Sequence, residues 1–413
     1  METSSGNREL VDFIRHQIDT HGPVTFRWFM QQALYHPKHG YYGSGRARIG
    51  YQGDFYTNVS VGRIFGELLA KQFEEMWLRM NKPVSFTILE EGAHDARFAA
   101  DVLSWTQRFS PELYERLKYW IIEPNPRFQQ EQQATLSTWP RNKIRWSQSL
   151  DQFEMGSLCG VHFSNELLDA FPVHLVTSAG GAWQENFVDM GRSGFRFVYG
   201  PPSSSQLRAA LDRLPVPALP PGVKEYRTEV NLAAPRWVED TSKVLGQGYI
   251  LAVDYGYPRE AYYAPERTAG TLATYHEHQR GDDPLVAVGE RDLTAHVEFT
   301  TLAERAEASG LRLSGYCDQH HFLVGLGEAE LLAIERSSPE LTPELLHFIR
   351  SFKTLMHPGT MGMAFKFIGF EKNVPPAATP LLGFSRCQEP YAALGLQPPD
   401  ARSKEDYDPY AAI

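Results

Sequence analysis

The chain of 413 residues is long enough for one large domain with insertions or for two domains. Hydrophobic residues make up 42% and charged residues 22%, and no apolar run approaches the roughly 20 residues that a membrane-spanning helix needs. The formal net charge of -10, without any basic run, argues against a nucleic-acid partner. The composition therefore predicts a globular protein that binds neither a membrane nor nucleic acid.

The cysteines, the histidines and the N-terminal residues indicate whether the protein binds a metal and in which cellular compartment it lies. The three cysteines are scattered without a CxxC pair, which indicates neither a disulfide framework nor a zinc site. Histidines gather in the last third of the chain, but none has the spacing of a metal motif such as HExxH. The first ten residues have neither an apolar signal core nor an acid-free, Arg-rich transit character. We expect a cytoplasmic protein without a bound metal.

The N-terminal region is predicted to be a helical cap with one exposed loop. Apolar residues at helical spacing predict helices over 8–18 and, with Thr25 as N-cap, from Phe26 to Ala33. The segment YYGSGRARIGYQGDF is rich in glycine and tyrosine and is expected to be a loop. A long amphipathic helix is then predicted from Val61 to Met80.

From residue 85 onward, predicted strands and helices alternate, which indicates a parallel sheet with helices on both faces. The expected strands are FTILE, YWIIE, KIRW, LCGVHFS, YILAVDYG and, later, segments around Leu311–Tyr316 and Met363–Phe370; helices are expected to about Phe109, from Pro126, over Ala234–Leu245 and near Phe299–Ser309. Between Ala182 and Tyr199 the pattern predicts an inserted β-hairpin. The Pro- and Ser-rich stretch from Pro201 to Gly222 is expected to be a surface excursion.

Acidic residues follow several of these strands. Ligands of an open parallel sheet bind beyond the carboxyl ends of its strands. The residues expected there are Glu90, Glu91, Gly92, Glu123, Asn165, Glu166 and Asp254. Such an acidic rim would repel a pyrophosphate and attract a sulfonium cofactor that also carries an ammonium group. Glu123 ends the second strand, where a carboxylate can accept hydrogen bonds from both hydroxyls of an adenosine ribose.

The turn after the first strand is EEGAHD. Gly92 removes a Cβ where a ligand would pass close to the backbone, although a simple tight turn would explain it equally well. Asp95 is a candidate cap for the next helix. The pattern GxGxxG is absent, which argues against a nicotinamide-dependent oxidoreductase.

The stretch FSNELLDAFPVH places Asn165, Glu166 and Asp169 so that all three face one pocket if a helix starts there. Carboxylates can bind a guanidinium through two parallel hydrogen bonds. Alternatively, the acids would only complement the dipole of a helix N-terminus. His296, in DLTAHVEF, is a candidate general base, and a hydrogen-bonded core histidine is the competing interpretation.

Several blocks together resemble a known family. They are ALYHPKHGYYG, GDFYTNVSVGRIFGELLA, EPNPRFQ, SNELLDAFPVH, WQENFV, VDYGYP, GTLATYHEHQRGDDPL and DLTAHVEFTTLAERAEASGL, which span Leu10 to Gly325. They closely resemble the signature blocks of the MidA-like family of S-adenosylmethionine-dependent methyltransferases. The mitochondrial member of that family is the arginine methyltransferase needed for assembly of respiratory complex I. The resemblance implies a class I, Rossmann-like α/β methyltransferase fold with a twisted seven-stranded sheet, a helical N-terminal cap and an inserted, substrate-facing β-hairpin and helical subdomain.

The pattern and the resemblance together predict five regions. These are the cap over 1–84, the first part of the cofactor-binding core over 85–181, the inserted hairpin and excursion over 182–233, the second part of the core over 234–374 with a substrate-facing insertion around 258–298, and a Pro-rich tail over 375–413.

The resemblance also implies roles for individual residues. Glu90 and Gly92 match the acid and the first glycine of the family's cofactor loop, and Glu123 matches its ribose-binding acid. Ser149 and Leu150 would lie near the adenine, and Asn165, Glu166 and Asp169 beside the methyl group. His94 and Ala96 stand where the family's loop has glycines, so His94 is expected either to lean over the cofactor or to point outward.

The implied reaction is in-line transfer of a methyl group from S-adenosylmethionine to a protein arginine. Glu166 and Asp169, with Glu229, are the candidates to hold the arginine cation and to take up its proton. Tyr41 and Asp254 are expected to face the substrate.

Two alternatives to an arginine acceptor stay open. One is a small-molecule O, N or C nucleophile enclosed by the hairpin and the loop over 41–56, with His296 as its base. The other is a non-catalytic assembly factor that has lost the cofactor through its altered loop. Family members are often dimeric, so the resemblance also points to a homodimer.

Overall fold

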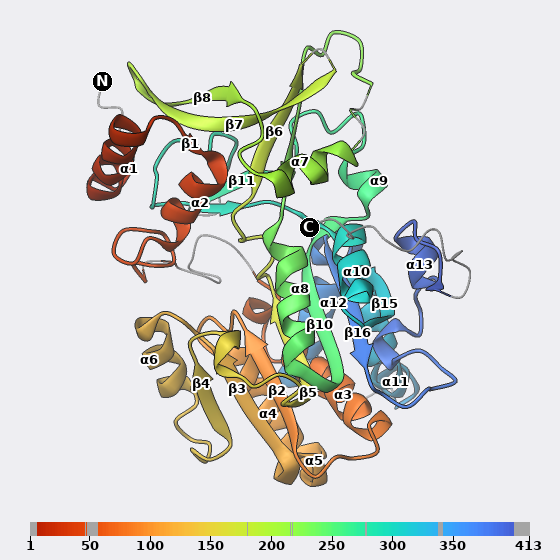
Figure 1. Cartoon of the computed structure of the whole chain (residues 1–413). Coiled ribbons are helices and arrows are strands. Elements are labelled where there is room, and N and C mark those ends of the chain that lie inside the picture. Colours follow the sequence, from red (N-terminus) through yellow and green to blue (C-terminus); the bar gives the residue numbers. More distant parts are fainter. Residues whose placement is uncertain are drawn as a thin grey trace.

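The computed structural model describes residues 6–45, 47, 57–179, 181–214, 216, 218–276, 279–337 and 342–399. Part of the predicted loop over 41–56 and the last residues of the predicted tail lie outside this set. Figure 1 shows two bodies: a sheet covered by helices in the lower part of the view, and a second, twisted sheet above it.

The lower body is built on a seven-stranded sheet. Its strands are β2 (Phe86–Glu91), β3 (Leu117–Ile122), β4 (Ile144–Ser147), β5 (Leu158–Asn165), β10 (Leu245–Tyr257), β15 (Arg312–Asp318) and β16 (Phe365–Lys372). Their order is β15-β16-β10-β5-β2-β3-β4, and the short β14 (Val297–Glu298) pairs with the end of β10. Strands β10, β5, β2, β3 and β4 run parallel, whereas β16 is antiparallel to both of its neighbours. The predicted fold class, a seven-stranded Rossmann-like methyltransferase sheet, is therefore confirmed.

Helices cover both faces of this sheet. One face packs against α3 (Ile64–Arg79), α4 (Arg97–Phe109), α5 (Pro111–Arg116), α11 (Gln319–Ser337) and α12 (Pro343–Met356), and the other against α8 (Ala233–Val244), α10 (Phe299–Ala308) and α13 (Pro390–Ala393). The sheet strands are almost continuously apolar because both faces are buried. The sequence analysis did not predict α11 and α12. The tail residues Leu381, Phe384, Tyr391 and Leu394 are also buried, so the described part of the predicted tail belongs to the core.

The upper body is an antiparallel sheet of β1 (Val24–Thr25), β6 (His174–Ala179), β7 (Ala182–Gly191), β8 (Gly194–Gly200) and β9 (Tyr226–Val230). The predicted hairpin is present as β7 and β8. The inserted sheet nevertheless begins at His174 rather than at residue 182, because β6 pairs with both β7 and β9. The predicted excursion over 201–222 contains a helix, α7 (Ser205–Asp212), whose first turn is capped by Ser204.

The predicted N-terminal cap is divided between the two bodies. Helices α1 (Arg8–His21) and α2 (Phe26–Tyr35) pack on the inserted sheet, and β1 pairs with β7. The predicted N-cap Thr25 accepts a hydrogen bond from the backbone N–H of Trp28 at 3.1 Å. By contrast, α3 packs in the core of the lower body. The N-terminal helices and the insertion therefore form one unit opposite the sheet (Figure 1).

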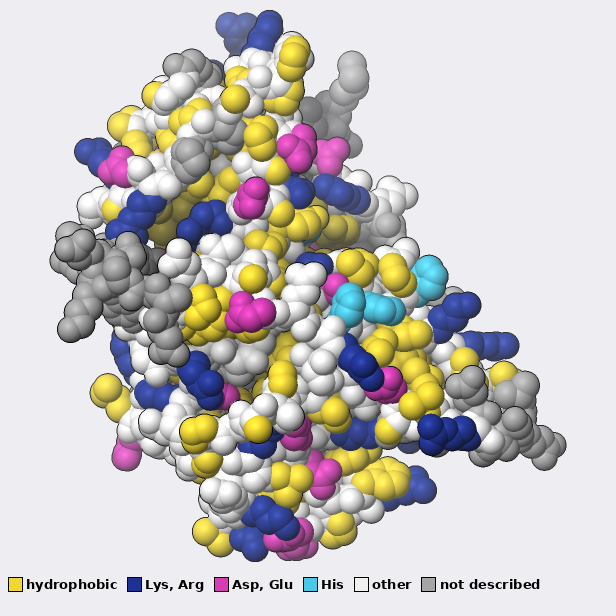
Figure 2. Space-filling view, turned by 90° about the vertical axis from the view of Figure 1, so that its right-hand side faces the viewer, with side chains coloured by type: hydrophobic (Ala, Val, Ile, Leu, Met, Phe, Trp, Pro, Cys, Tyr) yellow, Lys and Arg dark blue, Asp and Glu magenta, His cyan; other side chains and the backbone are white. Residues whose placement is uncertain are grey.

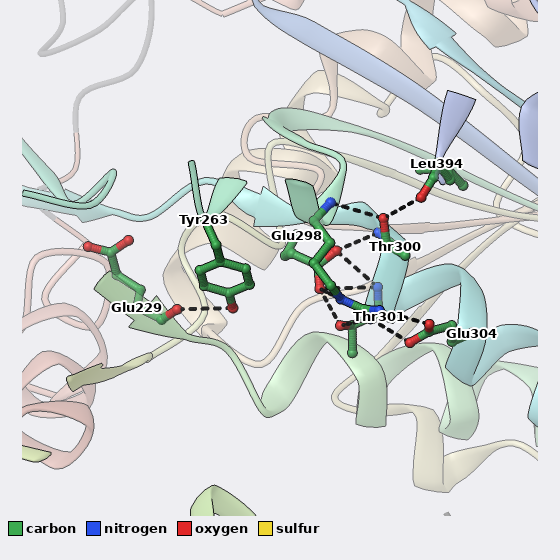
Figure 3. Close-up of polar contacts among 8 residues, drawn as sticks. Glu229, Tyr263, Glu298, Thr300, Thr301, Glu304 and Leu394 are labelled. Carbon is green, nitrogen blue, oxygen red and sulfur yellow. Dashed lines mark hydrogen bonds and ion pairs between the residues drawn. The ribbon is translucent and has the colours of Figure 1, made fainter. Parts of the chain in front are cut away.

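The insertion over 258–298 contains α9 (Arg259–Tyr262) and a small sheet of β11 (Ala273–His276), β12 (Gln279–Gly281) and β13 (Asp292–Thr294). Figure 3 shows how its two ends are fixed. Glu298 caps α10 by accepting from Thr300 and Thr301, while the Tyr263 hydroxyl donates to the backbone oxygen of Glu229. The guanidinium of Arg259 donates to Glu304 and to Thr301. These contacts join the insertion to both bodies.

The visible surface carries charge of both signs. Figure 2 shows Lys and Arg side chains scattered among acidic and apolar ones on this face, with no single basic stripe. Among the described residues, no helix is both long and apolar enough to cross a membrane.

Candidate active site

A cavity of about 1210 Å³ lies between the carboxyl ends of the parallel strands and the upper body. The sequence-predicted residues that line it are Glu90, Gly92, His94, Glu123, Ser149, Leu150, Asn165, Glu166 and Asp169. The lining also includes the basic side chains Arg27, Arg97 and Arg236. The structure thus gathers the predicted cofactor residues and the predicted methyl-site residues around one space.

The turn after β2 has an unusual backbone. Gly92 has a φ of 83°, and His94 and Ala96 have φ angles of 44° and 62°. The left-handed region costs a non-glycine residue about 1 to 2 kcal/mol. His94 and Ala96 therefore keep a backbone shape that glycine would adopt without strain. Asp95 accepts a hydrogen bond from the N–H of Arg97. The N-cap of α4 is nevertheless Ala96, one residue after the predicted cap, and no side chain caps the helix.

The two acids before Gly92 have different surroundings. Glu90 is buried and accepts a hydrogen bond from the Tyr119 hydroxyl at 2.7 Å. Burial raises the pKa of Glu90 to about 8. Glu91 accepts from the indole N–H of Trp237 at 2.9 Å, and its Oε2 lies 3.2 Å from Nε2 of His162. Both acids are therefore held by fixed neighbours at the cavity wall.

Glu123 follows β3 and is tied to the turn after β2. Its Oε1 accepts from the N–H of Asn125 at 2.8 Å, and its Oε2 from the side-chain amide of Gln132 at 2.9 Å. The same Gln132 amide donates to the backbone oxygen of His94, and Trp146 donates to the Gln132 oxygen. Burial raises the pKa of Glu123 to about 7. Gln132, from α6 (Pro126–Thr135), thereby couples the strained turn to the predicted ribose-binding acid.

The Asn165–Glu166 pair is held by a residue that the sequence analysis missed. Asn58 is fully buried, donates its amide to Asn165 at 3.1 Å and its backbone N–H to Glu166 at 3.2 Å. Asn165 donates to the same Glu166 oxygen at 2.9 Å. Burial raises the pKa of Glu166 to about 8, against the effect of these hydrogen bonds.

No helix starts after β5, so the condition under which Asn165, Glu166 and Asp169 were expected to face one pocket is not met, although all three line the cavity. Glu166 has a φ of 54°, and the chain continues as turns. The N–H groups of Leu168 and Asp169 donate to the carboxylate of Asp254 instead. Asp254 therefore fixes the backbone of this loop. It is buried and does not line the cavity, so the prediction that it faces the substrate is wrong.

A further acid enters the cavity from the insertion. Asp292, at the start of β13, is buried and lines the cavity together with Asp169 and Glu166. Burial raises the pKa of Asp169 well above its usual range, and the charges of Asp254, Asp292 and Glu166 raise it further. Four carboxylates are thus held close together in a poorly solvated place.

Three other predicted residues lie outside the cavity. Tyr41 is buried among the N-terminal helices, and its neighbour Tyr42 lines the cavity instead. Glu229 is fully buried and accepts hydrogen bonds from Thr271, Leu272 and Tyr262.

His296 is the third. It stacks on Tyr255 with ring centroids 6.0 Å apart, and burial lowers its pKa to about 4. His296 therefore does not line the cavity, as a base for the acceptor would. It is half-buried, and its Nδ1 has no hydrogen-bond partner among the described residues, so the competing interpretation of a hydrogen-bonded core histidine is not confirmed either.

The cavity suits an adenosine cofactor of the predicted kind. A Cβ on Gly92 would come within 3.3 Å of the cavity-lining Leu167, so the glycine keeps space open at the turn. Tyr42 and Gly43 lie over the region after β3, because the Asn125 amide donates to both of their backbone oxygens. Among the described residues, no group of three or more His, Cys, Asp or Glu side chains could hold a metal ion.

Comparison with known proteins decides the family. Residues 68–317 match the family model described as "Putative S-adenosyl-L-methionine-dependent methyltransferase". The chain belongs to this family. It is an S-adenosylmethionine-dependent methyltransferase, and S-adenosylmethionine is its cofactor.

Individual relatives cover nearly the whole of this methyltransferase. The mitochondrial protein arginine methyltransferase NDUFAF7 homolog of Drosophila melanogaster is 30% identical, over 93% of this chain and 90% of its own length. The mitochondrial protein arginine methyltransferase NDUFAF7 of Rattus norvegicus is 27% identical over 88% and 86%. A Burkholderia thailandensis protein solved with bound S-adenosylhomocysteine has 28% identity and a TM-score of 0.78, over 92% of this chain and 95% of its own.

Proposed function

We propose that this methyltransferase transfers its methyl group to an arginine side chain of a protein. The observation that carries the proposal is the group of carboxylates of Glu166, Asp169 and Asp292 that lines the cavity next to the cofactor turn. Asp169 and Asp292 are buried, and Glu166 is half-buried. Burial raises the pKa of Asp169, and the charges of neighbouring carboxylates raise it further. A group of this kind favours a cationic acceptor, because a cation would offset the mutual repulsion.

An arginine fits this chemistry better than a neutral acceptor does. The guanidinium stays protonated at neutral pH and can form two parallel hydrogen bonds with one carboxylate. S-adenosylmethionine supplies an electrophilic methyl group whose transfer leaves a neutral sulfur. The work of the protein is then to align the acceptor nitrogen, to exclude water and to manage one proton. Glu166 and Asp169 would orient the guanidinium so that one nitrogen faces the methyl group.

Two further points favour arginine over a small-molecule acceptor. The Drosophila and rat relatives named above are called protein arginine methyltransferases. The small-molecule alternative relied on His296 as base, and this residue lies outside the cavity lining. We therefore keep arginine as the proposed acceptor.

The test is methyl transfer from isotopically labelled S-adenosylmethionine to synthetic peptides with a single central arginine. The matched peptides carry lysine at the same position. Products are hydrolysed and identified by mass spectrometry. We expect methylarginine and no methyllysine; labelled lysine, or no labelled peptide at all, would contradict the proposal.

Two variants connect the activity to the carboxylates. Glu166→Gln should lower kcat/KM for the arginine peptide by about 10- to 100-fold, because a hydrogen bond to a charged group contributes about 1.5 to 3 kcal/mol. Its affinity for S-adenosylhomocysteine should change little. Glu112→Gln, an exposed acid on α5, is the control. If Glu166→Gln retained the unmodified enzyme's kcat/KM, the assignment of the carboxylates would be wrong.

A further inference from the structure

A histidine on the inserted sheet lines the cavity and has no role in the proposed function as described so far. His174, the first residue of β6, is buried, with 7% of its surface exposed, and it lines the cavity. Its Nδ1 lies 2.8 Å from Oε1 of Glu185 on β7. Glu185 is fully buried, and its Oε2 accepts a hydrogen bond from the N–H of Ser203 at 2.6 Å.

Glu185 determines which nitrogen of His174 carries the proton. Burial acts to raise the pKa of Glu185, but the hydrogen bonds from His174 and Ser203 outweigh it and hold the pKa below its usual range. The ionised carboxylate can only accept, so Nδ1 of the imidazole must donate. In the neutral ring, Nε2 then carries the lone pair. Among the described residues, none is hydrogen-bonded to Nε2.

His174 lines the same cavity as the proposed acceptor site. The lining includes Asp169, Ala170, Phe171 and Pro172, which lie just before β6 in the chain, together with His174. Ser203 and Ser204, beside Glu185 and at the start of α7, also line the cavity. His174 therefore belongs to the upper body, whereas the cofactor turn after β2 belongs to the lower body.

We propose that His174 is the catalytic base that takes the proton from the methyl acceptor, and that Glu185 is its positioning residue. The acceptor N–H or O–H bond breaks, its electron pair stays on the acceptor atom, and the proton joins Nε2. The resulting imidazolium is stabilised by the Glu185 carboxylate and later returns the proton to water. Carboxylates that hold a cationic acceptor are poor candidates for this step, because the cation lowers their basicity. This choice of base rests on the proposed cationic acceptor, whereas the tautomer of His174 is set by Glu185 whatever the acceptor is.

A purely structural role is the competing explanation. The His174–Glu185 pair would then only fasten β6 and β7 to the loop at Ser203. That role requires the Nδ1–H donor and makes no use of Nε2. A variant that keeps the donor and removes the second nitrogen therefore separates the two explanations.

His174→Asn is this variant, since the asparagine amide can replace the Nδ1–H donor toward Glu185. We expect an unchanged melting temperature and S-adenosylhomocysteine affinity, with kcat for the single-arginine peptide lowered by about 100-fold or more, the usual range for loss of a general base. KM for the peptide should change by less than about 3-fold. His320→Asn, whose Nδ1 contacts the backbone oxygen of Met356 outside the cavity, is the matched control.

A second measurement decides the question whatever the acceptor proves to be. In protein with ¹⁵N-labelled histidine and bound S-adenosylhomocysteine, the signals lost in His174→Asn report the tautomer of His174. We expect a protonated Nδ1 and an unprotonated Nε2 near neutral pH, and a mixture of both tautomers in Glu185→Gln. A proton fixed on Nε2, or wild-type kcat in His174→Asn, would overturn the inference. Absence of methylarginine with the wild-type enzyme would instead contradict the arginine proposal, and the tautomer would still decide on His174.

Discussion

Gly92 offers a direct test of how a single residue keeps the cofactor turn open. Its φ of 83° lies in the left-handed region, and a Cβ there would approach the cavity-lining Leu167. We expect Gly92→Ala to destabilise the fold by about 1 to 2 kcal/mol and to weaken S-adenosylhomocysteine binding by about 10-fold or more. Thermal unfolding and calorimetry measure the two effects.

Gly156→Ala is the matched control for this change. Gly156 also has a positive φ, 69°, but a Cβ there would meet nothing within 4 Å, and the residue is outside the cavity lining. It should lose similar stability and bind S-adenosylhomocysteine normally. Equal loss of affinity in both variants would show that backbone strain, and not the space at the turn, explains the Gly92 effect.

The pH dependence of cofactor binding tests Glu123. Burial raises the pKa of this carboxyl to about 7 in the empty protein, and an ionised carboxylate accepts the ribose hydroxyls best. Binding should therefore weaken as the pH falls below about 7, by up to about 10-fold per pH unit, and level off above it. Calorimetric titration with S-adenosylhomocysteine at several pH values measures this.

Two variants complete the pH experiment. Glu123→Gln should bind more weakly at pH 8 and lose the pH dependence between pH 6 and 8. Glu131→Gln, an exposed neighbour on α6, should behave like the unmodified protein. A Glu123→Gln protein with the original pH profile would contradict the assignment.

Local sequence pattern identified those site residues that directly follow a strand. Gly92, Glu123 and Glu166 were predicted because a parallel strand brings its next residues to the carboxyl edge of the sheet. Asn58 holds Glu166 without lining the cavity, and Asp292 lines it. Both were missed, because they come from segments more than 100 residues away from Glu166 in the chain. For Tyr41 and Tyr42, the prediction chose the wrong one of two adjacent tyrosines, and only packing against the N-terminal helices distinguishes them.

At the scale of elements, the insertion over 258–298 depends on one buried acid. Glu229, on β9, accepts hydrogen bonds from the N–H groups of Thr271 and Leu272 and from the hydroxyls of Thr271 and Tyr262. A glutamine would replace one of the two carboxylate oxygens by an NH2 group, which donates and cannot accept. At least one buried donor would therefore lose its partner. The insertion carries Asp292, so its position also affects the cavity.

We therefore expect Glu229→Gln to lower the free energy of unfolding by about 2 to 4 kcal/mol. Hydrogen exchange should increase in residues 258–276 more than in the central sheet. Glu266→Gln, an exposed acid of the same insertion, serves as control and should leave both measurements unchanged. Exchange that rises equally throughout the protein would argue against a local anchoring role.

Element prediction succeeded where periodicity was strong and failed where packing decided. The strands of the central sheet and the β7–β8 hairpin were recognised from apolar runs and turn residues. A helix after β5 was considered only as a condition, and the chain forms turns there instead, with Asp254 accepting from the N–H groups of Leu168 and Asp169. The long helix α11 is apolar on most sides and so lacks a clear amphipathic pattern.

At the scale of the whole molecule, the cavity lies between two bodies whose parts alternate along the chain. The lower body supplies the turn after β2, Glu123 and Glu166, while the upper body supplies His174 and the N-terminal helices. This arrangement places the cofactor residues on one side and leaves the other side for the acceptor. The predicted cytoplasmic location and homodimer stay predictions; the Drosophila and rat relatives are named as mitochondrial proteins.

A crystal structure of the protein with S-adenosylhomocysteine tests the central claim most directly. We expect both ribose hydroxyls to lie within hydrogen-bond distance of Glu123, the adenine to lie beside Ser149 and Leu150, and the sulfur to face Glu166 and Asp169. A ligand bound elsewhere, or one whose sulfur points away from these two carboxylates, would contradict it.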